Sequence, residues 1–319
     1  MNDQNPLNAI PLDGIDGANP LGFLAAIGTL AALSRAPDGE APRLAWEARS
    51  GAWRPIIHVN DVTERRVVID RLAKVLTQEE RNPAFSIGDD LNLACDSFRA
   101  AALEAQTAAD PGDRRFADFI AAFASDVIEA VVNGKPNGSI ADTAFRTMSG
   151  AGHQHFLGAM RTFVRDTTAD HLEKALFDQW AYDDPAEKHT MRWDPIDDVR
   201  YALRWRNPSG DPERKSGGSV WGANRLAVEA LPLFPTAPGQ KGLSTTGFTE
   251  RPRRGTFWTW PIWTALVGID VVRSLLALKE LQDSKPSRDR LIPRSIVEVY
   301  RSQRITQGKY RNFTYGVPA

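Results

Sequence analysis

One apolar segment near the start of the chain constrains the fold more than any other. It reads LGFLAAIGTLAAL and follows Asn19-Pro20. Asn is a good N-cap residue and Pro fits the first helical position, so the sequence predicts a helix that begins at Pro20. Gly22 and Gly28 are costly inside a helix. We therefore expect the backbone of a neighbouring segment to approach this helix closely.

The loop before this helix, LDGIDGA, is glycine-rich, and such a loop can hold an anion at a helix N-terminus. Asp13 and Asp16 within it argue against a phosphate there, so we interpret the loop as structural.

Composition places the chain among globular proteins with a full core. The chain has 319 residues, 42% of them hydrophobic, with nine Trp and fourteen Phe. This length allows two modest domains or one large one. The single cysteine, Cys95, excludes an intrachain disulfide, which suits a reducing compartment. With no signal-peptide pattern and no uninterrupted apolar span, we expect a cytoplasmic protein without membrane contact.

The pattern of candidate elements predicts an α+β fold. Residues 1–180 form an acidic, helix-rich region with a short hairpin, and residues 181–319 a basic region of mixed antiparallel strands and helices; the two could pack as one unit. The expected elements include a hairpin over 43–48 and 53–59, helices over 91–108, 114–132, 169–180 and 261–282, a turn-rich linker over 133–139, and strands over 243–249, 256–260, 294–305 and 309–317.

The charge of the chain is unevenly distributed. Residues 201–319 carry 19 Lys and Arg against 9 Asp and Glu, a net charge of +10, whereas residues 1–200 carry 20 against 31, a net charge of −11. A basic half is typical of a phosphate-binding surface, and an acidic half faces a basic partner or solvent. Neutralisation of one half by the other is the alternative.

The segment from Val199 to Arg206 alternates apolar side chains with arginines, as a strand with one apolar face would. Three guanidiniums on one face repel one another, a cost that an anionic partner would relieve; a solvated strand face is the alternative. A Pro-, Gly- and Ser-rich loop follows and adds two more cations. The candidate nucleic-acid contacts in this part of the chain are Arg200, Arg204, Arg206, Arg214 and Lys215.

A second basic cluster is predicted at a hairpin tip, in Glu250-Arg-Pro-Arg-Arg-Gly255. Its arginines are Arg251, Arg253 and Arg254, and Trp258, Trp260 and Trp263 follow in sequence. Arginines next to aromatic residues are typical of nucleic-acid surfaces, although tryptophans at these positions also suit a core. Basic residues of the tail continue the expected positive surface, namely Arg294, Arg301, Arg304, Lys309 and Arg311.

The segment at 148–160 contains glycines and two histidines that lead into a predicted helix. Free backbone N–H groups there, with His153 and His155, are candidates for contacts with an anion. A plain helix start, or metal or acid–base chemistry, remain the alternatives. Two histidines two residues apart on a helix point about 200° apart, which disfavours a shared metal ion.

The common enzyme signatures are absent: there is no P-loop, no G-x-S-x-G and no H-E-x-x-H. We therefore predict no catalytic residue, no metal and no cofactor. A hydrolase or nuclease using His153, His155 and a carboxylate such as Asp142 or Asp166 stays open as an alternative.

The residues from Asn19 to Leu30 follow the pattern N-P-x-x-F-x-A-x-x-G-x-L. Further short motifs follow later in the chain, at Trp193-Asp-Pro, Tyr201-Ala-Leu, Gly222-Ala-Asn224-Arg225-Leu-Ala and Trp260-Pro-Ile-Trp263. Together these motifs resemble those of proteins of the subtype I-U (I-G) CRISPR–Cas systems. The candidates within that group are a component or accessory of the RNA-guided interference complex and the family that extends the helicase-nuclease.

This resemblance implies a non-catalytic bacterial protein that engages guide RNA or target DNA, or assembles with other Cas proteins. In such complexes the protein reads backbone and shape while the guide reads sequence. Because the whole chain is near neutral, docking onto other Cas proteins, as a protein-only adaptor without nucleic-acid contact, is the alternative to direct binding.

Overall fold

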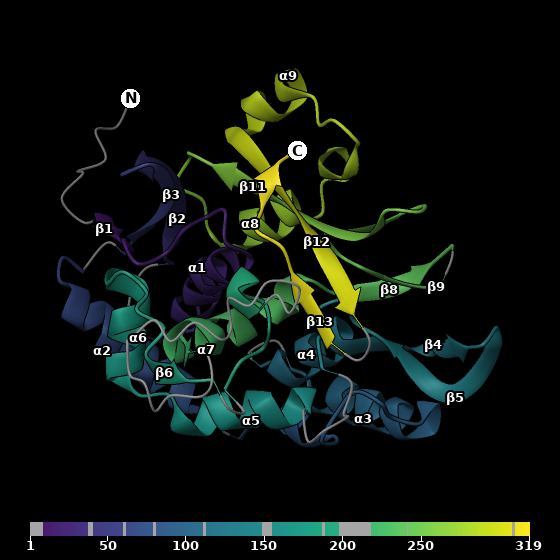
Figure 1. Ribbon diagram of the computed structural model, residues 1–319. Coiled ribbons are helices and arrows are strands. Elements are labelled where there is room, and N and C mark those ends of the chain that lie inside the picture. The colour runs from purple at the N-terminus through teal and green to yellow at the C-terminus, as the bar shows by residue number, and fades with distance from the viewer. Residues whose placement is uncertain are drawn as a thin grey trace, which may run out of the picture.

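The computed structural model describes residues 9–37, 41–59, 62–78, 81–110, 113–148, 155–186, 189–197, 218–240, 242–307 and 310–319. The fold is α+β, as predicted: an antiparallel C-terminal sheet lies against a layer of helices (Figure 1). None of the helices in these ranges is long and apolar enough to cross a membrane.

The helices are α1 (Pro20–Leu33), α2 (Arg65–Gln78), α3 (Cys95–Ala108), α4 (Arg115–Phe123), α5 (Phe156–Asp166), α6 (Ala169–Phe177), α7 (Trp221–Ala230), α8 (Ile269–Leu276) and α9 (Arg288–Leu291), with short 3-10 helices that include η5 (Pro195–Asp197) and η8 (Lys279–Gln282). The strands are β1 (Ala9–Pro11), β2 (Arg43–Arg49), β3 (Ala52–His58), β4 (Ala124–Val132), β5 (Lys135–Asp142), β6 (Asp184–Pro185), β7 (Gly218–Ser219), β8 (Thr236–Gly239), β9 (Gly242–Thr245), β10 (Phe248–Arg251), β11 (Gly255–Trp263), β12 (Ile296–Gln307), β13 (Tyr310–Phe313) and β14 (Val317–Pro318).

Helix α1 lies at the centre of the molecule, and all of its residues are buried (Figure 1). The predicted cap is confirmed: Asn19 Oδ1 accepts hydrogen bonds from the backbone N–H groups of Leu21 (2.9 Å) and Gly22 (3.3 Å). The expected close approach is also confirmed. Helix α7 packs so tightly against α1 that a Cβ on Gly28 would overlap the carbonyl of Leu226. Glycine is therefore required at this crossing.

A buried carboxylate ties α7 to its neighbours. Glu229 is fully buried, and its oxygens accept hydrogen bonds of 2.6 Å from Arg35, Arg115 and Arg225. Burial by itself raises the pKa of Glu229, but the three guanidiniums outweigh it and hold the pKa well below its usual range. The carboxylate therefore stays ionised and links the end of α1, the start of α4 and α7.

The opposite side of α1 packs against an aromatic cluster. The centroid of the Phe23 ring lies 5.7 Å from that of Trp46, with the two rings stacked. Its distances to the ring centroids of Trp258, Trp260 and Trp263 are 5.9, 5.7 and 6.3 Å. All four tryptophans are buried. Because these residues come from both regions of the chain, one hydrophobic core spans the boundary at 180/181.

The C-terminal sheet has the strand order β10-β11-β12-β13, with β14 also paired to β12, and all of its pairs are antiparallel. Strand β10 joins β11 through a tight turn, so the predicted basic hairpin is present. The β2–β3 hairpin and the pairing of β12 with β13 follow the sequence prediction as well.

Two predicted helices differ from the structure. The expected helix over 114–132 ends at Phe123, and Ala124 begins strand β4. Its partner β5 occupies most of the expected linker. Asn133 and Gly134 adopt positive φ angles of 51° and 76°, the turn that Asn-Gly favours in hairpins. The β-branched residues of β4 suit a strand, and the hairpin extends away from the helical layer (Figure 1).

The expected helix over 261–282 is the second correction. Strand β11 continues to Trp263 because Ile262 and Trp263 fill the aromatic core, and helix α8 begins only after Gly268. The 3-10 helix η8 then replaces the expected last turns. The apolar residues of this segment therefore serve two elements rather than one helix face.

The glycine at the α1–α7 crossing gives a first prediction. Replacing Gly28 by Ala should lower the free energy of unfolding by at least about 1–3 kcal/mol, because the added Cβ forces the two helix backbones apart. Urea denaturation measures the loss.

Gly268, the N-cap residue of α8, supplies the matched control, since the nearest atom to its built Cβ is 3.9 Å away. Gly268→Ser should be neutral or slightly stabilising. A Gly28→Ala variant within about 0.5 kcal/mol of wild type would contradict the tight crossing.

Candidate nucleic-acid interface

Five arginines gather at one end of the C-terminal sheet. Three belong to the β10–β11 hairpin, and two belong to β12 and β13. The strand register places them at the same end, because Arg251 pairs with Gly255, Thr256 pairs with Arg304, and Thr306 pairs with Arg311. Arg251 lies on the face of Arg301, whereas Arg304 and Arg311 lie on the opposite face. We call this set the arginine end of the sheet; its members are Arg251, Arg253, Arg254, Arg304 and Arg311.

The hairpin turn presents its arginines to solvent. The backbone N–H of Arg254 donates to the carbonyl of Arg251 (3.0 Å) and closes the turn, while Arg253 takes a left-handed φ of 61°. Arg253 and Arg254 are exposed. Arg251 is half-buried, and its guanidinium lies 5.5 Å from the centroid of the Phe257 ring. The turn therefore offers positive charge on a fixed backbone.

Arg304 and Arg311 lie on the same face of the sheet, since β12 and β13 pair Arg304 with Phe313 and Thr306 with Arg311. Both residues are half-buried. Arg304 Nη2 donates to the carbonyl of Arg146 (3.1 Å), but Arg304 Nε is shielded from solvent and has no hydrogen-bond partner among the described residues. Burial, and next the positive charge of Arg311, lower the pKa of Arg304 to about 10. Arg304 is thus a cation at neutral pH in an unfavourable environment.

Arg301 does not belong to the surface that the sequence suggested. It is 7% exposed, and its guanidinium donates to the carbonyls of Leu281, Asp283 and Ser284 and to Thr259 Oγ1. Burial, and next the charge of Arg251, lower its pKa to about 10. The alternation of a strand explains this correction: Arg301 and Arg304 point to opposite faces, and η8 covers the face of Arg301.

Surface arginines elsewhere in the described ranges mostly pair with carboxylates. Examples are Arg66 with Asp70, Arg99 with Asp96, Arg161 with Asp89, Arg273 with Asp270 and Arg294 with Glu280. At the arginine end, by contrast, no described carboxylate lies within 4.0 Å of a guanidinium nitrogen. Positive charge is therefore left without a carboxylate partner among the described residues at this end of the sheet.

Several predicted contacts lie outside the described residues: Arg200, Arg204, Arg206, Arg214, Lys215, His153 and Lys309. His155 is described; it is the half-buried N-cap residue of α5, and its side chain makes no capping hydrogen bond. Its role as an anion contact stays a prediction. The tryptophans expected beside the basic hairpin are core residues, as the alternative interpretation held for most of them.

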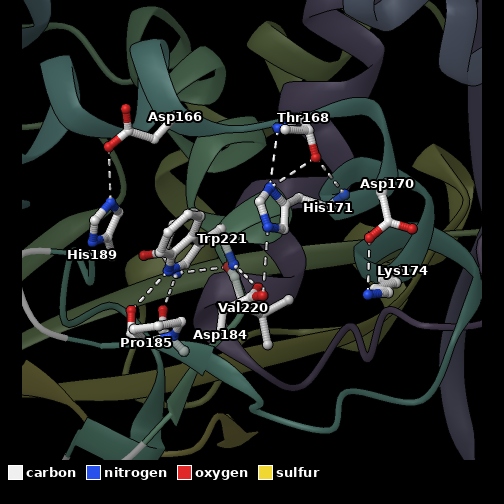
Figure 2. A network of polar contacts seen from close by, with 12 residues as sticks. Asp166, Thr168, Asp170, His171, Lys174, Asp184, Pro185, His189, Val220 and Trp221 are labelled. Carbon is white, nitrogen blue, oxygen red and sulfur yellow. Dashed lines mark hydrogen bonds and ion pairs between the residues drawn. The ribbon is translucent and has the colours of Figure 1, made fainter.

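A histidine and tryptophan cluster, which the sequence analysis missed, lies where α7 begins. Figure 2 shows Trp221 between His189 and His171. The His189 ring stacks on the indole at 3.9 Å between centroids, and the His171 ring lies 4.8 Å away. The signal that could have indicated His171 is its position three residues after Thr168, where it completes a capping box for α6.

Each histidine of this cluster faces a carboxylate. His189 Nε2 lies 3.2 Å from Asp166 Oδ2, and His171 Nε2 lies 3.7 Å from Asp184 Oδ1 (Figure 2). Asp184 also accepts the backbone N–H of Trp221 (2.9 Å). These contacts join β6, α6 and the start of α7, so we interpret the cluster as a structural junction.

The carboxylates of the hydrolase alternative are both engaged in ion pairs. Asp142 pairs with Arg146, and Asp166 pairs with Arg165 as well as His189. The hydrogen bond from Arg165 is the main reason that the pKa of Asp166 falls to about 2. Within the described part of the chain, no three His, Cys, Asp or Glu side chains are grouped so that they could hold a metal ion.

A buried carboxyl group lies under the start of α1. Asp194 is 3% exposed; its Oδ2 accepts hydrogen bonds from Tyr182 Oη (3.1 Å) and from Asn19 Nδ2 (3.4 Å), and its Oδ1 accepts one from the backbone N–H of Ile196 (3.0 Å). Burial raises the pKa of Asp194 to about 7, although the hydrogen bond from Ile196 opposes the shift. This residue therefore titrates near neutral pH.

The comparisons with known proteins add no relative. No protein-family model, no curated protein and no solved structure matches this chain.

Asp194 makes stability depend on pH. Between about pH 4 and pH 7 the folded state keeps a proton on Asp194 that the unfolded chain has lost, so this residue makes stability fall as pH rises. In Asp194→Asn this contribution is absent. Relative to wild type, the variant should gain up to about 1.4 kcal/mol of unfolding free energy per pH unit in that window.

Urea denaturation of both proteins at several pH values from 4.5 to 8 tests this expectation. The slope difference is the criterion, because the amide also changes the hydrogen bonds with Tyr182 and Asn19 and so shifts stability at every pH. Parallel pH profiles for the two proteins would show that the Asp194 carboxyl does not titrate in this range.

Proposed function

We propose that this protein binds the phosphate backbone of nucleic acid through the arginine end of its C-terminal sheet, as a non-catalytic subunit or accessory of a CRISPR–Cas interference system. The observation that carries the binding proposal is the group of five arginines without a carboxylate partner among the described residues. Uncompensated guanidiniums on a fixed backbone are suited to phosphate oxygens, which accept hydrogen bonds from their planar N–H groups.

The form of this surface favours recognition of backbone rather than of base sequence. Trp258, Trp260 and Trp263 are buried, so they offer no face on which a base could stack. The exposed residues of the hairpin turn include the charged Arg253 and Arg254. Charge contacts with phosphate give binding that tolerates sequence and weakens with salt. This behaviour suits an RNA-guided complex, in which base pairing with the guide supplies sequence specificity.

The placement in a CRISPR–Cas system rests on the resemblance of the Asn19–Leu30 segment. The structure gives that segment a physical role: Asn19 caps α1, Phe23 enters the aromatic core and Gly28 permits the contact with α7. The other Cas proteins of an interference complex are then the expected protein partners.

Contact with another protein is the second candidate function, and the β4–β5 hairpin is the observation that favours it. The hairpin projects from the molecule (Figure 1). Val127 is 66% exposed and Val131 is 65% exposed on it, Val132 is exposed as well, and Leu103 of α3 is a further exposed apolar residue. Apolar side chains in such a position are typical of protein–protein contact surfaces. Co-purification with a partner that persists after nuclease treatment would support this function.

Removal of the hairpin charges tests the nucleic-acid proposal. The triple variant Arg251→Gln, Arg253→Asn and Arg254→Gln takes away three cations, and Asn tolerates the positive φ at position 253. Its affinity for single-stranded RNA, single-stranded DNA and duplex DNA is compared with wild type over a range of salt concentrations. The slope of log K against log salt for single strands should shrink by about 2, since each phosphate contact contributes about 0.7.

The matched control removes three cations that have carboxylate partners, through Arg66→Gln, Arg99→Gln and Arg273→Gln. Both triple variants change the net charge equally, so a difference between them reports the location of the charge. If both triple variants weaken nucleic-acid binding equally, the loss of affinity reflects net charge and not the position of the arginines. Salt-independent or undetectable binding by wild type would overturn the proposal of direct binding.

A further inference from the structure

We propose that Arg304 and Arg311 form an internal binding site for a single phosphate group. The inference rests on the proposed function where it takes this group from a nucleic-acid backbone. The site is distinct from the exposed hairpin turn, because its two guanidiniums are half-buried on the β12–β13 face of the sheet.

The first support is the shortage of acceptors around Arg304. A guanidinium has five N–H donors. That of Arg304 makes one hydrogen bond within the described residues, from Nη2 to the carbonyl of Arg146. Its Nε is shielded from solvent and has no partner among the described residues, which is a costly state for a charged donor. An anion beside Arg304 would accept from the remaining Nη donors, because the shielded Nε is out of its reach.

The second support is the distribution of nearby carboxylates. Asp90 and Asp142 are the acidic groups of this neighbourhood, and the guanidinium of Arg146 binds both; its contact with Asp90 is 2.8 Å. Arg146 Nε donates to the carbonyl of Met148 (2.7 Å), so Arg146 is well supplied with acceptors. Neither Arg304 nor Arg311 forms an ion pair with a described carboxylate. The charge of Asp142 also acts on Arg304 from beyond ion-pair distance, so the guanidiniums of Arg146, Arg304 and Arg311 outnumber the two carboxylates near them.

The third support is electrostatic. The lowered pKa of Arg304 has burial as its first cause and the charge of Arg311 as its second, so the two arginines repel each other in the folded protein. The two residues come from adjacent paired strands and lie on the same face, so the ladder keeps their backbones close together. A bound phosphate would turn this repulsion into attraction for both side chains.

Phosphate fits this arrangement better than a carboxylate does. A carboxylate has two oxygens in one plane, which a single guanidinium occupies in a bidentate pair. A phosphate offers oxygens in several directions, so two guanidiniums from neighbouring strands can bind different oxygens at once. The site would therefore hold one backbone phosphate at a fixed position, while the hairpin turn adds contacts at its exposed edge.

Inorganic phosphate is the probe that tests the site apart from nucleic acid. Isothermal titration calorimetry on the full chain, at constant ionic strength set with chloride, should detect binding to wild type. Arg311→Gln should weaken this binding about tenfold or more, since a charge-assisted hydrogen bond is lost. Phosphate should also raise the melting temperature of wild type more than that of Arg311→Gln.

Two variants that leave both arginines of the site in place serve as controls. The hairpin triple variant should bind inorganic phosphate as wild type does, and Arg273→Gln should as well. Arg304→Lys keeps the charge but lacks the planar fork, so it should also weaken phosphate binding. Circular dichroism confirms that each variant is folded. Equal phosphate affinity in wild type and Arg311→Gln, or no detectable phosphate binding to wild type, would overturn the inference.

An oligonucleotide arm separates the inference from the proposed function. If wild type binds inorganic phosphate through Arg311 but binds no RNA or DNA, the site stands and its ligand is a free phosphate or a small phosphorylated molecule, while the proposed function fails. If wild type binds nucleic acid and Arg311→Gln binds both nucleic acid and inorganic phosphate equally well, the proposed function stands on the hairpin turn and the internal site is refuted.

Discussion

The contact between α1 and α7 is the constraint on which the rest of the structure depends. Gly28 lets the two backbones meet, and this brings the residues of α7 into the centre of the protein, where Glu229 binds three arginines from different elements. The opposite side of α1 carries Phe23 into the tryptophan cluster of the C-terminal sheet. One helix therefore positions both the helical layer and the sheet, and a shift of α1 would disturb both.

This arrangement explains why the charge of the C-terminal half does not spread evenly over its surface. The middle of the sheet is used for core packing, since β11 fills it with Trp258, Trp260 and Trp263. Arg301, which lies in that middle, is held by backbone carbonyls under η8. Arginines of the sheet reach the surface towards the hairpin end, where Arg253 and Arg254 are exposed. Charge without a carboxylate partner reaches the surface at this end because the tryptophans and Arg301 in the middle of the sheet are buried.

Local signals in the sequence predicted local structure well. The cap at Asn19, the glycine at position 28 and the β10–β11 hairpin follow from capping, from helix cost and from turn chemistry. The helices expected over 114–132 and 261–282 failed because apolar periodicity does not report which partner a segment finds: β4 pairs with β5, and Trp263 enters the core. The same limit applies to the site, since no local pattern distinguishes the buried Arg301 from the half-buried Arg304 three residues later.

Two segments that the sequence predicts to bind anions follow directly, along the chain, after described residues near the arginine end. Arg146 accepts the hydrogen bond from Arg304 and lies shortly before the 149–154 segment with His153. Asp197 ends η5, which packs against β13, and Arg200 follows three residues later. Repulsion between Arg304 and Arg311 would be hard to maintain in a purely structural role, because an apolar residue at either position would relieve it. A bound phosphate would offset this repulsion, because its negative charge attracts both guanidiniums.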